Sequence, residues 1–390
     1  MDRGRARLRD ARRIVVKLGT AVVTHADAGI ALGRIGAIVE ELAVLHREGR
    51  QVLLVTSGAI GMGQRALKLP ERPRSLGLRQ ACAAVGQGQL MALYSQLFGQ
   101  LGVTVAQVLL SQSDLGERDR LLCLRTTLMR LIELRVIPIL NENDSVSVRE
   151  LIEHRRREGE ADVDELPFGD NDGLSARVAL SVDADALVLL SDVDGVYTDN
   201  PNLDPGALRI GLVPEIDDAM VARARGGSAG GTGGMASKLS AAREAAEGGT
   251  AVLIASGHKP GVIARALAGE DVGSWIPATE RHDAHRRAIV RAARSEGALV
   301  VNAGALEALT KRKASLLPVG VTAVIGEFLA GDVVELRDGS GRVHGRGLAN
   351  YDAAACRALI GRRSAEIAAV LGWRGYDTVI TRDNLVLSGV

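Results

Sequence analysis

Short runs of β-branched and aliphatic residues alternate with longer segments of helical periodicity from Arg13 to Ile276. In the longer segments, apolar residues recur every three or four positions, which predicts helices, and the runs between them predict buried strands. The predicted strands are 13–18, 51–58, 103–110, 136–140, 186–192 and 250–256, and the predicted helices are 32–48, 78–101, 118–134, 173–180 and 235–247. This alternation predicts βαβ units, and therefore an α/β fold with a mainly parallel sheet and helices on both faces.

The pattern changes after Ile276. The stretch 277–287 is charged and has no periodicity, which favours a linker. Beyond it, short apolar runs alternate with turns, and helical spacing returns around 304–310 and 353–371. We therefore predict three parts, which are a first domain over 1–278, a linker over 279–296 and a small β-rich domain over 297–390.

Composition narrows the class of protein. The 390 residues include 46 glycines but only 3 Phe, 4 Tyr and 2 Trp, so the core must be built from aliphatic side chains. The glycines show no three-residue repeat, which excludes collagen, and we expect them at tight turns and where the backbone approaches a ligand. The net charge of +1 excludes a strongly basic nucleic-acid-binding protein.

The cysteines and the first residues bear on location. Cys82, Cys123 and Cys356 are few and far apart, which predicts a reducing compartment without a disulfide framework or a zinc site. The first thirteen residues contain no apolar stretch, and the chain has no run of 18 apolar residues. We therefore expect a cytoplasmic protein with no signal peptide and no membrane span.

Two lysines stand out in otherwise apolar or glycine-rich surroundings. Lys17 ends the first predicted strand, where a charge is costly unless it reaches an anion or a cleft. Lys238 ends the stretch GGTGGMASK (230–238), which leads directly into a helix and can present backbone N–H groups to a phosphate. The alternatives are an edge-strand lysine that extends outward and a flexible glycine linker.

Polar loops follow several of the predicted strands. They are TSGAIGMG (56–63), NENDSV (141–146), GDND (169–172) and SDVDG (191–195). Each taken alone is explained by turn chemistry, but the carboxyl ends of parallel strands lie at one edge of a sheet. Lysines, glycine amides and acids without a nucleophile–base pair are the residues that phosphoryl transfer needs. A carboxylate acceptor would need no general base, because it is already ionised at pH 7.

Taken in order, these motifs resemble the amino acid kinase family, and within it the members that phosphorylate glutamate. The motifs are VVKLGT (15–20), VTSGAIGMG (55–63), AAVGQGQL (83–90), LNENDSV (140–146), FGDND (168–172), LLSDVDGVYT (189–198), GTGGMASK (231–238) and SGHKPGVI (256–263). NAGALEAL (302–309), SLLPVGV (315–321) and GRGLANY (345–351) resemble a PUA domain. The resemblance implies an αβα sandwich followed by a small β-rich PUA-like domain.

The resemblance also implies a reaction and a role for each motif residue. Transfer of the ATP γ-phosphate to the γ-carboxylate of L-glutamate, with Mg²⁺, would give L-glutamyl 5-phosphate, the first step of proline biosynthesis. Lys17 and Lys238 would contact the phosphoryl group, and Asp172 would hold the two lysines in place. Glutamate would be bound by Ser57, Asp144 and Asn171. ATP would be bound by Lys17, Ser191, Asp192, Thr232, Gly233, Gly234, Met235, Ala236, Ser237 and Lys238, with no protein residue assigned to the metal.

The family resemblance further implies feedback inhibition by proline and a homo-oligomer, either a dimer or a tetramer. Two departures from the family pattern are a charged insertion at 149–167, which is a surface excursion or a lid, and Ala236 at a position often held by a hydroxyl residue. One alternative function is a kinase for another acid, such as acetylglutamate or aspartate. A second is RNA binding through the PUA-like domain, because Lys and Arg outnumber Asp and Glu by five from Arg281 to Val390.

Overall fold

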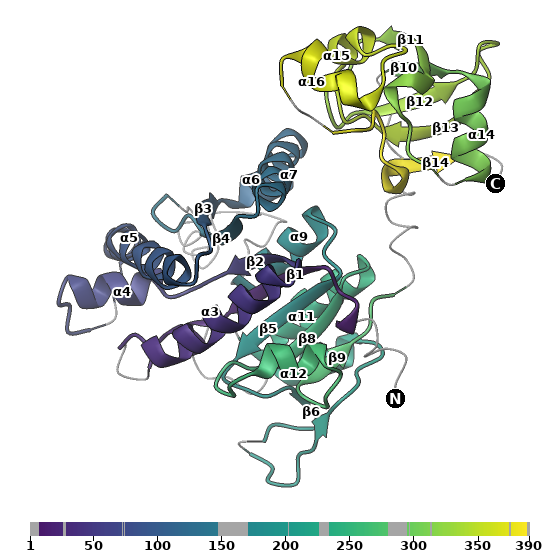
Figure 1. Cartoon of the computed structure of the whole chain (residues 1–390). Helices are drawn as coiled ribbons and strands as arrows, with labels where there is room; N and C mark the ends of the chain where they lie inside the picture. The colour runs from purple at the N-terminus through teal and green to yellow at the C-terminus, as the bar shows by residue number, and fades with distance from the viewer. Residues whose placement is uncertain are drawn as a thin grey trace, which may run out of the picture. The chain divides into compact units, whose positions relative to one another are not determined.

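The computed structural model describes residues 8–25, 29–71, 73, 75–146, 171–201, 203–225, 234–279, 295, 297–312, 314–373 and 376–387. The chain divides into two compact units, Met1–Thr279 and Glu280–Val390 (Figure 1). Apart from Thr279 and Ser295, the predicted linker lies outside the described residues, as does the charged insertion at 149–167.

The first unit is built on a seven-stranded sheet with the strand order β3-β4-β2-β1-β5-β8-β9. Its strands are β1 (Arg13–Leu18), β2 (Gln51–Val55), β3 (Val105–Leu110), β4 (Ile137–Glu142), β5 (Ala186–Ser191), β8 (Ala251–Ser256) and β9 (Ser274–Ile276). All neighbouring strands are parallel except β9, which runs antiparallel to β8. The predicted α/β fold with a mainly parallel sheet is therefore confirmed, and the short edge strand β9 is an addition to it.

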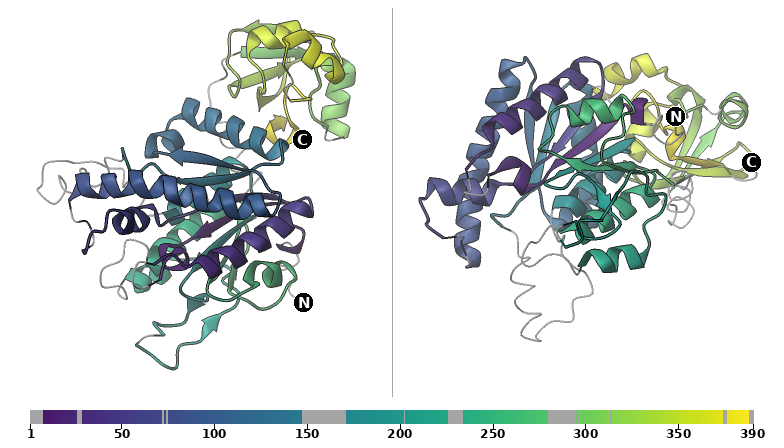
Figure 2. Two further views of the ribbon diagram at one scale, coloured as in Figure 1. Left: turned by 60° about the vertical axis from the view of Figure 1, so that its left-hand side comes forward. Right: turned by 90° about the horizontal axis from the view of Figure 1, so that it is seen from below.

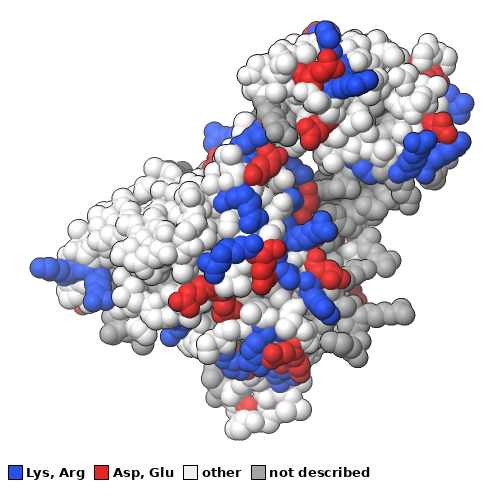
Figure 3. All heavy atoms as spheres, viewed as in Figure 1, with Lys and Arg blue, Asp and Glu red and all other residues white. Residues whose placement is uncertain are grey.

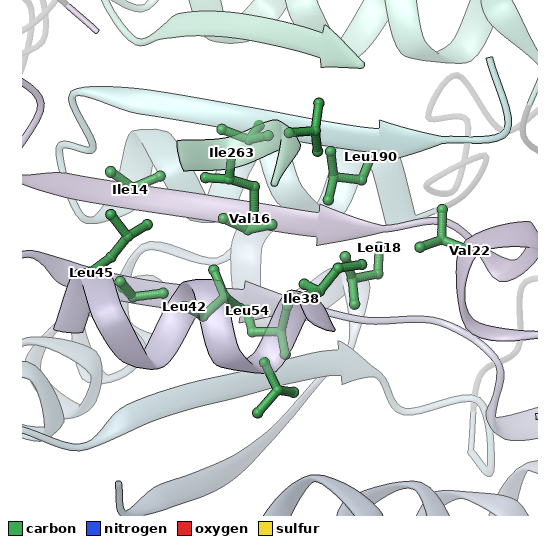
Figure 4. Close-up of a cluster of buried hydrophobic side chains, with 14 of the residues drawn as sticks. Ile14, Val16, Leu18, Val22, Ile38, Leu42, Leu45, Leu54, Leu190 and Ile263 are labelled. Atoms are coloured by element: carbon green, nitrogen blue, oxygen red, sulfur yellow. The ribbon is translucent and has the colours of Figure 1, made fainter. Parts of the chain in front are cut away.

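Helices cover both faces of this sheet (Figure 2). One face is covered by α3 (Leu32–Arg47), α5 (Leu76–Gln100) and α12 (Val262–Leu267), and the other by α7 (Arg118–Glu133), α9 (Asn171–Ser181) and α11 (Met235–Glu247). Side chains alternate along β1, so Ile14, Val16 and Leu18 enter the core beneath α3 (Figure 4). Val15, between them, enters the core on the opposite face.

Short elements connect these layers. They are α2 (Thr20–Val23), α4 (Ala59–Ala66), α6 (Gln112–Gly116), α10 (Asp218–Arg225) and the hairpin of β6 (Val196–Tyr197) with β7 (Arg209–Ile210). The sequence pattern did not predict them, because each is too short to show a period. The predicted helix 173–180 was placed too late, since the described part of α9 begins at Asn171, so Asn171 and Asp172 are helical.

Helices α4 and α5 approach each other unusually closely, and glycine permits the approach. A Cβ atom at Gly63 would lie 1.8 Å from the carbonyl oxygen of Cys82, and one at Gly86 would lie 1.8 Å from that of Ala59. No side chain fits in either place, because real Cβ atoms do not come within 3.0 Å of such an atom. These two glycines therefore allow α5 to lie directly against α4, the helix that follows β2.

The second unit has its own core beneath a five-stranded sheet of order β11-β10-β12-β13-β14. Its elements are β10 (Gly297–Val301), α14 (Ala303–Lys311), β11 (Val321–Gly326), β12 (Val333–Arg337), β13 (Val343–Leu348), α15 (Ala353–Ala358), α16 (Ile367–Leu371) and β14 (Leu385–Leu387). The prediction of one helix over 353–371 was wrong. The chain turns at Gly361, whose φ of +70° ends the helical path, so α15 and α16 are separate.

Within the described residues, no helix has both the length and the apolar character needed to cross a membrane. On the face of the molecule in Figure 3, acidic and basic side chains lie interspersed, while the part over α4 and α5 is nearly free of charge. This uncharged area agrees with the sequence, which has no Lys, Arg, Asp or Glu from Gln80 to Ser113.

Candidate active site

Polar residues gather at the edge of the large sheet where β1, β2, β4, β5 and β8 end. Because these strands are parallel, their carboxyl ends lie side by side, and α9 and α11 begin at the same edge. Backbone hydrogen bonds hold the loops together there, since Gly19 N–H donates to Leu190 O and Gly257 N–H donates to Ser191 O. Two clusters of polar side chains occupy this edge, one charged and one neutral.

Strand alternation accounts for the direction of Lys17. Val15 enters the core on the α9 and α11 face, and Lys17, two residues later, extends toward that same face. Asp172 lies in the first turn of α9 and Lys238 in the first turn of α11. Three segments that are far apart in the sequence thus bring their charges to one place. We call Lys17, Asp172 and Lys238 the lysine cluster.

The lysine cluster is almost sealed from water. Lys17 Nζ lies 2.5 Å from Asp172 Oδ1, and Lys238 Nζ lies 3.4 Å from Asp172 Oδ2. Asp172 is fully buried, and the two lysines are 4% and 6% exposed. One carboxylate between two ammonium groups leaves these three side chains with a net charge of +1. Two ammonium groups close together at the sheet edge can form charge-assisted hydrogen bonds to an anionic ligand that binds there.

The neutral cluster is a chain of amides beside it. Asn171 Nδ2 shares its two hydrogens among three acceptors, which are Thr56 O at 2.7 Å, Ser57 Oγ at 2.8 Å and Asn141 Oδ1 at 3.0 Å. Asn141 Nδ2 in turn donates to Gln87 Oε1 of α5 at 2.8 Å. We call Thr56, Ser57, Gln87, Asn141 and Asn171 the amide cluster. Because Ser57 Oγ accepts the bond from Asn171, its own hydrogen is available to a substrate.

The third part of the site lies at the end of β5. Ser191 is buried and donates to Asp192 Oδ1 at 2.8 Å. Partial burial raises the pKa of Asp192, but the hydrogen bonds from Ser191 and the backbone and the charges of Lys238 and His258 outweigh it. The pKa of this carboxyl therefore lies below its ordinary value. The influence of Lys238 on Asp192 connects this strand end with the lysine cluster.

The structure thus joins Lys17, Asp172 and Lys238 in one cluster and Ser57 and Asn171 in the other. Among the remaining residues assigned from the sequence, Asp144 lies half-buried in the turn after β4. Gly234 caps α11, and Met235, Ala236 and Ser237 form its first turn, while Thr232 and Gly233 lie outside the described residues.

Asn141 and Gln87 were not assigned from the sequence. Asn141 stands in the motif NENDSV, where its signal was only that of a polar turn, yet it is the last but one residue of β4 and 2% exposed. Gln87 lies inside a predicted helix, and nothing in the local pattern distinguishes it from Gln89. The sequence would have singled out Gln87 only if it had shown which polar residue of AAVGQGQL faces the protein interior. The spacing of apolar residues does not show this.

Comparison with known families agrees with this geometry. A model of the amino acid kinase family matches residues 12–256, and a model of the PUA domain matches residues 297–371. The chain therefore belongs to the amino acid kinase family and carries a PUA domain after the kinase unit. The resemblance inferred from the motifs is confirmed, and with it a kinase that transfers phosphoryl groups.

Relatives that span the whole chain make the similarity more specific. The glutamate 5-kinase of Moorella thermoacetica is 44% identical over 387 residues, which cover 99% of this chain and 98% of that protein. The glutamate 5-kinase of Myxococcus xanthus is 45% identical over 386 residues, 98% of each chain. A third, from a Synechococcus species, is 44% identical over 377 residues, 96% of this chain and 98% of that one.

Proposed function

We propose that this chain is an ATP-dependent kinase that phosphorylates the γ-carboxylate of L-glutamate. The observation that carries the proposal is the buried lysine cluster directly beside the amide cluster, with Asn171 and Asp172 contributing one neighbouring residue to each. The name shared by the full-length relatives supports glutamate as the acid. The product is L-glutamyl 5-phosphate, which places the enzyme at the first step of proline biosynthesis.

The lysine cluster acts on the transferring phosphoryl group. Lys17 and Lys238 neutralise the negative charge on its oxygens, and Asp172 keeps the two ammonium groups oriented and limits their mutual repulsion. A γ-carboxylate oxygen attacks the γ-phosphorus while the bond to the β,γ-bridging oxygen breaks and ADP leaves. No proton moves, because the acid is ionised at pH 7. Positioning and charge neutralisation are therefore the whole contribution of these residues.

The amide cluster and Asp144 hold the amino acid. The free hydrogen of Ser57 donates to a carboxylate oxygen of glutamate, and Asp144 attracts its α-ammonium group. Asn171 is tied to Thr56, Ser57 and Asn141 through its amide nitrogen, so its oxygen is left as an acceptor for the substrate. These contacts align the γ-carboxylate with the phosphoryl group.

ATP lies along the ends of β5 and the start of α11. Ser191 and Asp192 bind ATP together with the segment Thr232, Gly233, Gly234, Met235, Ala236, Ser237 and Lys238, whose described part, from Gly234 on, presents the N-terminus of α11. The described residues contain no group of three His, Cys, Asp or Glu side chains arranged to hold a metal. We expect Mg²⁺ to enter with ATP and to offset the charge of its phosphates.

The test is a product assay on the purified protein. With ATP, L-glutamate and hydroxylamine, the acyl phosphate is trapped as a coloured hydroxamate. We expect hydroxamate from glutamate and none from N-acetylglutamate or aspartate. Hydroxamate from one of the other acids, and not from glutamate, would overturn the substrate assignment while leaving the kinase activity in place.

The same assay tests the expected regulation. We expect added proline to inhibit hydroxamate formation, because feedback inhibition accompanies the first step of a biosynthetic route in this family. Light scattering on the same preparation tests the expected homo-oligomer, a dimer or a tetramer. Activity that stays constant as proline is added would remove the regulatory part of the proposal without affecting the catalytic part.

A further inference from the structure

Helix α5 braces the acid end of the site at two points. Gln87 Oε1 accepts a hydrogen bond from Asn141 Nδ2, and the Tyr94 hydroxyl lies 2.9 Å from Thr56 Oγ1. Gln87 and Tyr94 are seven residues apart, which is two turns, so they lie on the same side of the helix. That side faces the carboxyl ends of β2 and β4.

The amide of Gln87 supports the direction in which Asn141 faces Asn171. An amide offers an acceptor on one side and donors on the other. With its NH₂ group bonded to Gln87, Asn141 must present its Oδ1 to Asn171. Asn171 then turns its own NH₂ group toward Asn141, Thr56 and Ser57 and leaves its Oδ1 on the opposite side. The NH₂ side of Asn171 is thus held from two directions, by Thr56 O, which can only accept, and by Asn141, whose orientation Gln87 of α5 supports.

We propose that Gln87 is a positioning residue that sets the affinity for the amino acid substrate by acting through Asn141 on Asn171. The inference rests on the proposed function, because it takes the amide cluster as the acid-binding part of the site. Gln87 is not expected to touch the reacting atoms, which the lysine cluster surrounds. It is half-buried, whereas Gln89, on the same helix, is exposed.

The proposal predicts which kinetic constant changes. Without the acceptor on Gln87, Asn141 can turn, and its Oδ1 then no longer faces the NH₂ group of Asn171. The bonds to Thr56 O and Ser57 Oγ remain, so binding is weakened rather than abolished. We expect the KM for the acid to rise about five- to twentyfold, the change that follows from losing one buried hydrogen bond. The kcat and the KM for ATP should stay within about twofold.

The experiment uses Gln87→Met, which keeps the length of the side chain and removes the acceptor. Gln89→Met is the matched control, since it makes the same change on the exposed side of α5. Each full-length variant is assayed with ATP and the acid that the wild type phosphorylates, and its melting temperature is recorded. Should Gln87→Met not yield folded protein, Gln87→Leu serves in its place with the same expectation.

A double variant separates action through Asn141 from direct contact. If Gln87 works only through Asn141, then adding Gln87→Met to Asn141→Ala should change the KM by less than about twofold. Additive losses would overturn the relay and assign Gln87 to direct binding. An unchanged KM in Gln87→Met, or an equal rise in Gln89→Met, would overturn the proposal. So would a parallel loss of kcat, ATP affinity and melting temperature, which a purely structural role predicts. The proposed function is tested separately, by identifying the acid that the wild type phosphorylates.

Discussion

The lysine cluster and the amide cluster adjoin each other at the start of α9, but they are built from opposite materials. The first holds three charges with almost no access to water, and the second holds only neutral amides, two hydroxyls and a carbonyl. The helix behind the amide cluster continues the contrast, because the chain carries no Lys, Arg, Asp or Glu from Gln80 to Ser113. Asn171 and Asp172 are consecutive, yet one belongs to each cluster.

This difference follows from what each end of the site must do. Phosphoryl transfer moves negative charge between oxygens, and fixed positive charges in a dry site stabilise that charge strongly. Recognition of a small acid instead needs direction, which neutral amides supply because their donors and acceptors are fixed in a plane. The lysine cluster should therefore control turnover, and the amide cluster should control affinity. Substitutions in the two clusters can test this division.

The largest effect is expected at Lys238. Lys238→Met removes one positive charge beside the phosphoryl group but leaves Asp172 paired with Lys17 at 2.5 Å, so the fold should be kept. We expect kcat to fall about a thousandfold, with a much smaller change in the KM for the acid. Lys311→Met is the matched control, because this lysine is 75% exposed and belongs to the second unit. A near-normal kcat in Lys238→Met would contradict the role given to the lysine cluster.

The next largest effect is on stability, at Asp172. Asp172→Asn keeps the shape of the side chain but leaves two buried ammonium groups without their carboxylate. We expect the free energy of unfolding, measured with urea, to fall by about 3–5 kcal/mol. The exposed pair of Asp218 with Arg243 provides the control, and Asp218→Asn should cost less than about 1 kcal/mol. Equal losses of unfolding free energy in the two variants would show that water screens the charges of the lysine cluster as it screens those of an exposed pair.

The two clusters also differ in how far the sequence alone predicts them. Burying a lysine in an apolar strand, or next to a glycine-rich loop, costs free energy unless the lysine contacts an anion. These two lysines therefore indicated a binding site from the sequence alone. Asp172 was found as part of a polar loop, although it stands in the first turn of α9. The fold class followed from the alternation of strands and helices in the same way, because buried strands impose a local pattern.

Only part of the amide cluster could be predicted from the sequence, and the reason is physical. Asn171 and Ser57 stand at the ends of predicted elements, but the contact between Gln87 and Asn141 joins residues 54 positions apart. It depends on where α5 crosses the strand ends, and this crossing depends on close packing that no local period records. The glycines of TSGAIGMG were expected at a ligand, yet Gly63 is required by the carbonyl of Cys82.

Packing of α5 supplies the third prediction. Gly86→Ala would place a methyl group where the Ala59 carbonyl oxygen now lies, so α5 must shift away from α4. We expect a loss of about 1–3 kcal/mol in the free energy of unfolding and a raised KM for the acid, because Gln87 moves with the helix. Gly88→Ala on the same helix meets no atom within 4 Å and should instead stabilise by about 0.5–1 kcal/mol. Equal effects at the two glycines would contradict the close approach.

The smallest effect should come from the second brace of α5. Tyr94 is fully buried with its hydroxyl against Thr56, and Tyr94→Phe should cost about 1 kcal/mol in unfolding free energy at pH 7. The KM for the acid should not change, because Tyr94 contacts the side-chain hydroxyl of Thr56, whereas Asn171 is held by the main-chain oxygen of Thr56. Burial raises the pKa of Tyr94 to about 12, against an ordinary value of 10.0. Because the pKa is raised in the folded protein, the stability that Tyr94 contributes is complete below pH 10 and is lost as the pH rises toward 12.

The pH dependence sharpens this test. The wild type should lose its advantage over Tyr94→Phe between pH 10 and 12, because the unfolded chain ionises its tyrosine first while the buried hydroxyl cannot. Urea unfolding of both proteins at pH 7 and pH 10.5 measures the difference, and titrations common to both cancel. An advantage that stays constant across this range would mean that Tyr94 is not sealed in the core. A change in the KM of Tyr94→Phe would mean that the two braces of α5 do not act separately.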